Sequence, residues 1–131
     1  MTTDFSGLGL SAILSQVQQG KERLIAAASR KTTAYERNYP SYKGELCALV
    51  MGLRKFMHIL LFKPFLVFTD SSALKYLATL KEPTGIMARW LEEVQNYRME
   101  VHHKPGKLNR NADTLSRAAH LAPPSAEEIQ E

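Results

Sequence analysis

The sequence contains a single cysteine, Cys47, which excludes an intrachain disulfide framework and a cysteine-based zinc cluster. No apolar stretch is long enough to span a bilayer, and the opening "MTTDFSGLG" lacks the basic and hydrophobic regions of a secretory signal. No internal repeat is present either. These absences predict an intracellular protein with no membrane association, in which Cys47 is a buried structural thiol.

The composition is that of an ordinary globular domain, with 44% hydrophobic and 23% charged residues in 131. Seventeen basic and thirteen acidic residues give a net charge of +4, which favours a polyanionic partner without proving one. The acidic end "SAEEIQE" follows "APP" and is typical of a solvated tail. We therefore expect one domain over residues 1–118 and a flexible acidic tail over residues 119–131.

The first third of the chain predicts an antiparallel meander, because short apolar stretches are separated by "GLG" and by a turn at Gly20. An amphipathic helix follows over "PSYKGELCALVMGLRKFMHILLF", with Ser41 as its N-cap and Pro64 after its end. Its apolar face is predicted to consist of Tyr42, Leu46, Leu49, Leu53, Phe56 and Leu60.

The remaining segments alternate between strand and helix patterns. "FLVFTD" predicts a buried strand, and "SSALKYLATL" a helix capped by Ser71 or Ser72. "GIMARWLEEVQNY" predicts another helix, "RMEVHHK" a strand, and "NRNADTLSRAA" a last helix capped by Asn109. The order is that of an α/β domain.

Four acidic residues occupy positions that differ from those of ordinary surface charge. Asp4 lies in the first strand, Glu45 lies early in the long helix, Asp70 ends the central strand, and Asp113 lies in the first turn of the last helix. Each alone has a structural explanation, such as capping or interaction with a helix dipole. If the first and fourth strands are neighbours, the four carboxylates converge.

Such a cluster would repel itself unless cations were bound. Carboxylate oxygens suit Mg²⁺ or Mn²⁺, and two such ions about 4 Å apart can stabilise the attacking and leaving oxygens of a phosphodiester. The residues therefore favour metal-assisted phosphodiester hydrolysis.

Several segments, in order and with similar spacing, resemble the RNase H domain of gypsy-type LTR-retrotransposon polyproteins. The resemblance covers roughly residues 2–118, through "TDFSGLGLSAILSQ", "ASRKTTAYERNYPSYKGELCALVMGLRKFMHIL", "FTDSSALKYL", "ARWLEEVQNY" and "HHKPGKLNRNADTLSR". It implies an RNase H-like fold: a mixed five-stranded sheet, with strands 1–3 antiparallel and strands 4 and 5 parallel to strand 1, and helices on both faces. It also implies cleavage of the RNA strand of RNA–DNA hybrids with two Mg²⁺ ions, for which Mn²⁺ would substitute.

The resemblance assigns a role to each carboxylate. Asp4 would bridge both metals, and Glu45 would hold the second metal near the 2′-hydroxyl that distinguishes RNA from DNA. Asp70 would bind the metal at the leaving oxygen, and Asp113 the metal that activates water.

Other residues near these positions are predicted to contact substrate. Among the basic residues, Lys104, Lys107 and Arg110 would meet phosphates. The hydroxyls of Ser6 and Ser71 would bind the substrate backbone, and Asn109 either contacts the hybrid or only caps its helix. His103 is a possible catalytic assistant, although a histidine at a strand end is more often a solvent-facing residue.

Two other functions remain open: a catalytically weak or inactive RNase H-like module that binds nucleic acid or a polymerase, and a domesticated protein-binding domain. By resemblance, the partners would be an RNA–DNA hybrid and the reverse transcriptase polymerase domain of the same polyprotein. The location would be cytoplasmic virus-like particles. The basic protrusion of some cellular relatives is not evident, so we expect weak hybrid binding by the isolated domain.

Overall fold

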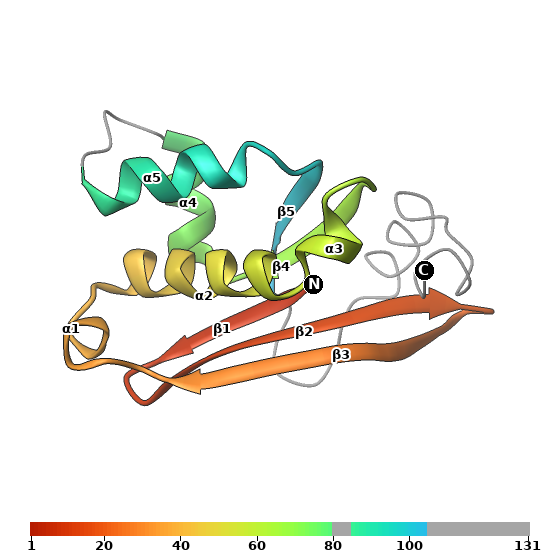
Figure 1. The fold of residues 1–131 in the computed structure, drawn as a ribbon, viewed down its shortest axis with the longest axis horizontal. Helices are drawn as coiled ribbons and strands as arrows, with labels where there is room; N and C mark the ends of the chain where they lie inside the picture. Colours follow the sequence, from red (N-terminus) through yellow and green to blue (C-terminus); the bar gives the residue numbers. More distant parts are fainter. Residues whose placement is uncertain (80–84, 105–131) are drawn as a thin grey trace.

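Three antiparallel strands form one side of the sheet in the computed structural model, which describes residues 1–79 and 85–104 (Figure 1). They are β1 (Thr2–Ser6), β2 (Gly9–Gln18) and β3 (Lys21–Lys31). Between β2 and β3, Gln19 and Gly20 have φ values of 52° and 78°. Two successive positive φ angles are those of a tight type I′ hairpin turn, so the predicted turn at Gly20 is confirmed.

Two parallel strands complete the sheet. β4 (Phe65–Thr69) pairs with β1, and β5 (Met99–His103) pairs with β4, which gives the order β3-β2-β1-β4-β5. All five residues of β4 are buried, as the apolar run predicted. The mixed five-stranded sheet of an RNase H-like fold is therefore confirmed, including the parallel pairing of the first and fourth strands.

The longer helices are α2 (Ser41–Lys55), α4 (Ser71–Thr79) and α5 (Ile86–Val94), and they lie together over one face of the sheet (Figure 1). Leu46, Leu49 and Leu53 of α2 are fully buried in the core between this layer and the sheet. None of the helices within residues 1–79 and 85–104 is long and apolar enough to cross a membrane.

Two residues at the centre of β4 face the side of the sheet opposite these helices. In β4, Val67 belongs to the core beneath the helices, so its neighbours Leu66 and Phe68 point to the other face. Both are nevertheless buried. The helix predicted over residues 109–119, the tail and the proposed boundary at residue 118 lie outside the described residues.

Three details of the helices differ from the prediction. Ser41 is the first residue of α2 and not its cap, because Pro40 occupies the N-cap in an extended conformation. The long helix is interrupted at Phe56, after which a short helix α3 (Met57–Leu60) follows. Neither Ser71 nor Ser72 caps α4, since the backbone N–H of Ser72 donates to the side chain of Asp70.

A short helix, α1 (Ala34–Arg37), was not predicted. Thr33 accepts a hydrogen bond from the Glu36 backbone, and Glu36 accepts one from the backbone of Thr33. This reciprocal arrangement is a capping box, and the sequence "TAYE" carries its signature.

Helix α2 approaches the sheet most closely at Gly52. A Cβ atom added there would lie 2.8 Å from the Ala12 Cβ of β2 and 2.8 Å from the Met1 sulfur. Ala12 has no flexible side chain to move aside, so any larger residue at position 52 would push α2 from the sheet.

We expect Gly52→Ala to lower the free energy of unfolding by about 1–3 kcal/mol, although alanine favours helix formation. Overpacking against Ala12 is the physical reason. Urea denaturation measures the change, and Gly7→Ala is the matched control because a Cβ at Gly7 meets nothing within 4 Å. Equal stability of the two variants would contradict the packing argument.

Candidate active site

The parallel register places two of the predicted carboxylates side by side. Thr2 of β1 is paired with Phe68 of β4, and Thr69 of β4 with His103 of β5. Continuing both registers along the strands brings Asp4, Asp70 and Lys104 into one row across three neighbouring strands. Their order along the chain conceals this row.

Lys104 is the third residue of this row and contacts both of the other strands, β1 and β4. Its ammonium lies 2.8 Å from Asp4 Oδ1 and donates to the Thr3 carbonyl at 3.1 Å, while its backbone N–H donates to the Thr69 carbonyl at 2.7 Å. The side chain therefore reaches from the end of β5, across β4, to β1. Its charge also lowers the pKa of Asp70.

Glu45 faces this row from the second turn of α2. It is only 3% exposed, and burial raises the pKa of its carboxyl to about 7, with further increases from Asp4 and Asp70 and an opposing effect from Lys104. Its Oε2 has no hydrogen-bond partner within the described part of the chain. Asp4, Asp70 and Lys104 therefore all act electrostatically on the Glu45 carboxyl, and the metal-ligand role of the three acids stays a prediction.

Asp70 has two roles in this arrangement. Its Oδ1 accepts a hydrogen bond of 2.7 Å from the Ser72 backbone N–H, so the carboxylate caps α4. That bond is the main reason why the pKa of Asp70 is lowered, and Lys104 and His103 lower it further. The capping explanation and the ligand explanation are therefore compatible, because the cap holds the carboxylate in place.

A further side-chain contact joins the first turn of α2 to the first turn of α4. Ser41 Oγ, at the first residue of α2, lies 3.1 Å from Ser72 Oγ in the first turn of α4. This contact ties the end of α2 that bears Glu45 to the end of α4 that Asp70 caps.

The donor set suits a hard divalent cation, because all three side chains offer oxygen and Glu45 retains an unpaired buried oxygen. Within residues 1–79 and 85–104, however, no group of three or more histidine, cysteine, aspartate or glutamate side chains is arranged so that it could hold a metal ion. Asp113, the fourth predicted carboxylate, lies outside the described residues.

The predicted substrate contacts are placed as follows. The Ser6 hydroxyl accepts hydrogen bonds from the Leu8 and Gly9 backbone N–H groups, so it stabilises the turn between β1 and β2. Ser71 is exposed at the start of α4, and His103 is exposed at the end of β5. Lys107, Asn109 and Arg110 lie outside the described residues.

An open hollow of about 430 Å³ adjoins Asp4 and contains two basic residues that sequence reasoning missed. Arg30 and Lys31, at the end of β3, lie opposite Leu10 and Gly9 of β2. The signal in the sequence was the pair "RK" at the end of the third strand, which becomes informative only when β3 is placed near Asp4. The lining residues are Asp4, Ser6, Leu8, Gly9, Leu10, Ser11, Ser29, Arg30 and Lys31.

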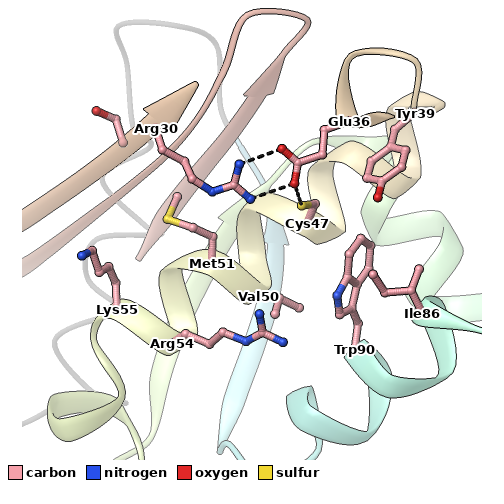
Figure 2. A pocket seen from close by; sticks show the side chains of 11 residues that line it. Arg30, Glu36, Tyr39, Cys47, Val50, Met51, Arg54, Lys55, Ile86 and Trp90 are labelled. Atoms are coloured by element: carbon pink, nitrogen blue, oxygen red, sulfur yellow. Dashed lines mark hydrogen bonds and ion pairs between the residues drawn. The ribbon is translucent and has the colours of Figure 1, made fainter. Parts of the chain in front are cut away.

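A second hollow, of about 480 Å³, lies between β3, α2 and α5 (Figure 2). Its polar groups satisfy one another: Arg30 makes two bonds of 2.7 and 2.8 Å to Glu36, and the Cys47 thiol donates to the same carboxylate. Arg30 holds the pKa of Glu36 at about 2, and burial raises the pKa of Cys47 to about 11. Cys47 is thus a buried, unreactive thiol, as predicted.

The comparisons with known proteins agree with this geometry. Residues 1–97 match the family model described as the RNase H-like domain found in reverse transcriptase. The chain also resembles the foamy viral protease-reverse transcriptase in complex with dsDNA, with a TM-score of 0.61 and 18% identity over 83% of this chain and 24% of that one. That likeness shows the fold alone.

Curated relatives are retrovirus-related Pol polyproteins. The chain is 38% identical to that of Drosophila melanogaster transposon 297 and 34% identical to that of transposon gypsy, with 89% of this chain covered in each case. It is also 34% identical, over 89% of its length, to the genome polyprotein of petunia vein clearing virus. The chain spans 11% of each transposon polyprotein and 6% of the viral one.

The fold and the carboxylate row define an RNase H-like domain. The chain belongs to the RNase H-like domains of reverse transcriptase polyproteins, of the gypsy-like retrotransposon type.

The raised pKa of Glu45 makes the stability of the metal-free protein depend on pH. Its folded-state pKa of about 7 exceeds the ordinary glutamate pKa of 4.5, so the stabilising contribution of the proton is complete below about pH 4.5 and is lost as the pH rises through about 7. We expect Glu45→Gln, which cannot ionise, to show a smaller decrease in melting temperature between about pH 5 and about pH 8.5.

Melting curves in a chelator measure this difference. Glu92→Gln, at an exposed position of α5, is the matched control and should follow the unmodified protein. If the Glu45→Gln curve runs parallel to the control across the pH range, Glu45 does not carry the proton.

Proposed function

We propose that the domain is a ribonuclease H that cleaves the RNA strand of RNA–DNA hybrids endonucleolytically during reverse transcription. The observation that carries the proposal is the alignment of Asp4 with Asp70 across β1 and β4, beside a buried Glu45 on which both act electrostatically, in a chain of this family. The proposed site would draw these acids from three separate elements, and metal-assisted hydrolysis of a phosphodiester would use them as metal ligands.

Asp4, Glu45 and Asp70, with Asp113, would hold two Mg²⁺ ions, for which Mn²⁺ would substitute. When bound, the ions would supply positive charge that stabilises the attacking and leaving oxygens of the phosphodiester. The all-carboxylate donor set and the unpaired Oε2 of Glu45 support this assignment.

The chain's own residues would position these groups. The backbone pairing of β1 with β4 fixes the separation of Asp4 and Asp70, and the Ser72 N–H fixes the orientation of the Asp70 carboxylate. Glu45 approaches from a helix that is locked to the sheet at Gly52. Rigid elements of this kind hold a reactive geometry better than loops do.

The hybrid would bind across the hollow beside Asp4, where Lys31 and Arg30 offer positive charge. The Arg30 guanidinium is already bound to Glu36, so Lys31 is the more available of the two. Further proposed substrate contacts are Ser6, Ser71, Lys104, Lys107, Asn109 and Arg110, and His103 is a possible assistant.

A second candidate function is a catalytically weak or inactive module that binds nucleic acid or a polymerase. The ion pair between Lys104 and Asp4 favours it, because that pair neutralises one of the proposed ligands. Whether the unmodified chain cleaves an RNA–DNA hybrid distinguishes the two functions.

The family assignment supports the remaining proposals. The nuclease domain would extend over residues 1–118, with residues 119–131 as its tail. It would act beside the reverse transcriptase polymerase domain of the same polyprotein, inside cytoplasmic virus-like particles.

We expect the unmodified chain to cleave a labelled RNA–DNA hybrid in Mg²⁺ or Mn²⁺, and Asp70→Asn to lose at least about 100-fold of that activity. Asparagine still accepts the hydrogen bond from the Ser72 N–H, so the melting temperature should change little.

Asp70→Ala provides the comparison, because it removes both the charge and the cap. It should lose the same activity and, in addition, about 1 kcal/mol of stability. No cleavage by the unmodified chain in either metal, or equal cleavage by Asp70→Asn, would reject the nuclease assignment.

We expect Lys31→Ala to weaken hybrid binding and to reduce by about one the slope of log Kd against log salt concentration, because one phosphate contact is lost. Lys55→Ala is the control, since Lys55 lines the other hollow (Figure 2). Fluorescence anisotropy at several salt concentrations measures both, and identical slopes would exclude Lys31 from the binding surface.

A further inference from the structure

Lys104 holds an unusual position for a basic residue. Its ammonium lies 2.8 Å from Asp4 Oδ1, although the two residues belong to strands separated by β4. The backbone of Lys104 is anchored by the 2.7 Å bond to the Thr69 carbonyl, so the reach towards β1 starts from a fixed point. The side chain is 28% exposed.

The charge of Lys104 acts on all three described carboxylates. It pairs directly with Asp4, it contributes to the lowered pKa of Asp70, and it opposes the rise that burial causes in the pKa of Glu45. Carboxylates that act on one another electrostatically are stabilised by a nearby cation, and this ammonium supplies one from within the chain.

One carboxylate oxygen of the three acids has no hydrogen-bond partner among the described residues. This oxygen is Glu45 Oε2, which is buried, and leaving such an oxygen unpaired is costly. A single ammonium bound to Asp4 therefore does not satisfy the whole cluster. The site has an internal cation and, among the described residues, a buried carboxylate oxygen without a hydrogen-bond partner.

We propose that Lys104 is a built-in counter-ion of the carboxylate site, whose ammonium neutralises the cluster in the metal-free protein and leaves Asp4 when a divalent cation binds. The inference rests on the proposed metal-dependent function and deepens it. Lys104 is a positioning residue in this role: it keeps the acids assembled without metal and sets the metal concentration that the site requires.

The exposure of the pair makes the exchange feasible. The Asp4 side chain is 61% exposed, so water screens its attraction to Lys104 and a divalent ion can reach it directly. Apparent metal affinity is then the intrinsic affinity reduced by the fraction of molecules in which Lys104 has left Asp4.

The test compares Lys104→Met with the unmodified full chain, because methionine keeps the length of the side chain and removes its charge. We expect Lys104→Met to bind Mn²⁺ on the order of tenfold more tightly by calorimetry at low salt, since no ammonium competes for Asp4. Without metal, the same variant should melt at a lower temperature, because the carboxylates lose their counter-ion.

Lys55→Met is the matched control, at an exposed lysine near the end of α2, and it should bind Mn²⁺ as the unmodified chain does. Equal or weaker Mn²⁺ binding by Lys104→Met, relative to this control, would overturn the counter-ion role.

A second measurement avoids any loss of folding in the variant. In the ¹³C,¹⁵N-labelled, unmodified chain, the side-chain ammonium signal of Lys104 should shift during a Mg²⁺ titration, with the same midpoint as the ¹³C signal of the Asp4 carboxylate. The Lys55 ammonium serves as the internal reference. A Lys104 signal that stays fixed while Asp4 responds would also overturn the inference.

The two proposals fail in different ways. If the unmodified chain binds Mn²⁺ and cleaves the hybrid, but Lys104→Met gains no affinity, only the counter-ion role is wrong. If neither the unmodified chain nor either variant binds Mn²⁺, and no hybrid is cleaved, the metal-dependent function fails and the counter-ion role fails with it.

Discussion

The parallel pairing of β1, β4 and β5 is the constraint on which the site depends. It aligns Asp4 with Asp70, and aligns Lys104 with both, through backbone hydrogen bonds that are indifferent to side-chain charge. Two like charges are thereby held side by side at an energetic cost that other groups must offset. The ammonium of Lys104 and the cap at Ser72 provide that offset within the chain.

Helix α2 carries the third acid, Glu45, on which Asp4, Asp70 and Lys104 act electrostatically. Its packing at Gly52 sets its distance from the sheet, and the contact between Ser41 and Ser72 ties its first turn to α4. Glu45 is buried as a result, and its carboxyl titrates near neutrality. The same packing that stabilises the core therefore determines the electrostatic state of the site.

The two hollows differ in how far the polar side chains that line them are bound to one another. Around Glu36, the charged groups are bound to one another, so the arrangement stabilises the junction of β3, α1 and α2 (Figure 2). Beside Asp4, Lys31 lines an open surface, and within residues 1–79 and 85–104 the Asp4 carboxylate has its ion pair with Lys104. Satisfaction of polar groups, and not the volume of the hollow, distinguishes a structural cavity from a candidate binding surface.

Much of the architecture was predictable because it depends on local patterns. The turn at Gly20 needs residues that tolerate positive φ, β4 is one continuous apolar run, and the heptad-like spacing of Leu46, Leu49 and Leu53 defines a buried helix face. Local reasoning failed at Ser41 and at Ser71, where a neighbouring proline or aspartate occupies the cap position.

The sequence by itself determined the order of the five strands and the positions of α2, α4 and α5, the burial of Cys47 and, through resemblance, the set of acids to consider. Only the tertiary structure decided that Lys104 binds Asp4, that Glu45 Oε2 finds no partner among the described residues, and that Lys31 lines the hollow beside Asp4. The reason is physical: propensity and periodicity act over a few residues, whereas these contacts join strands up to 100 residues apart. Strand register sets such contacts, and register emerges only when the sheet is assembled.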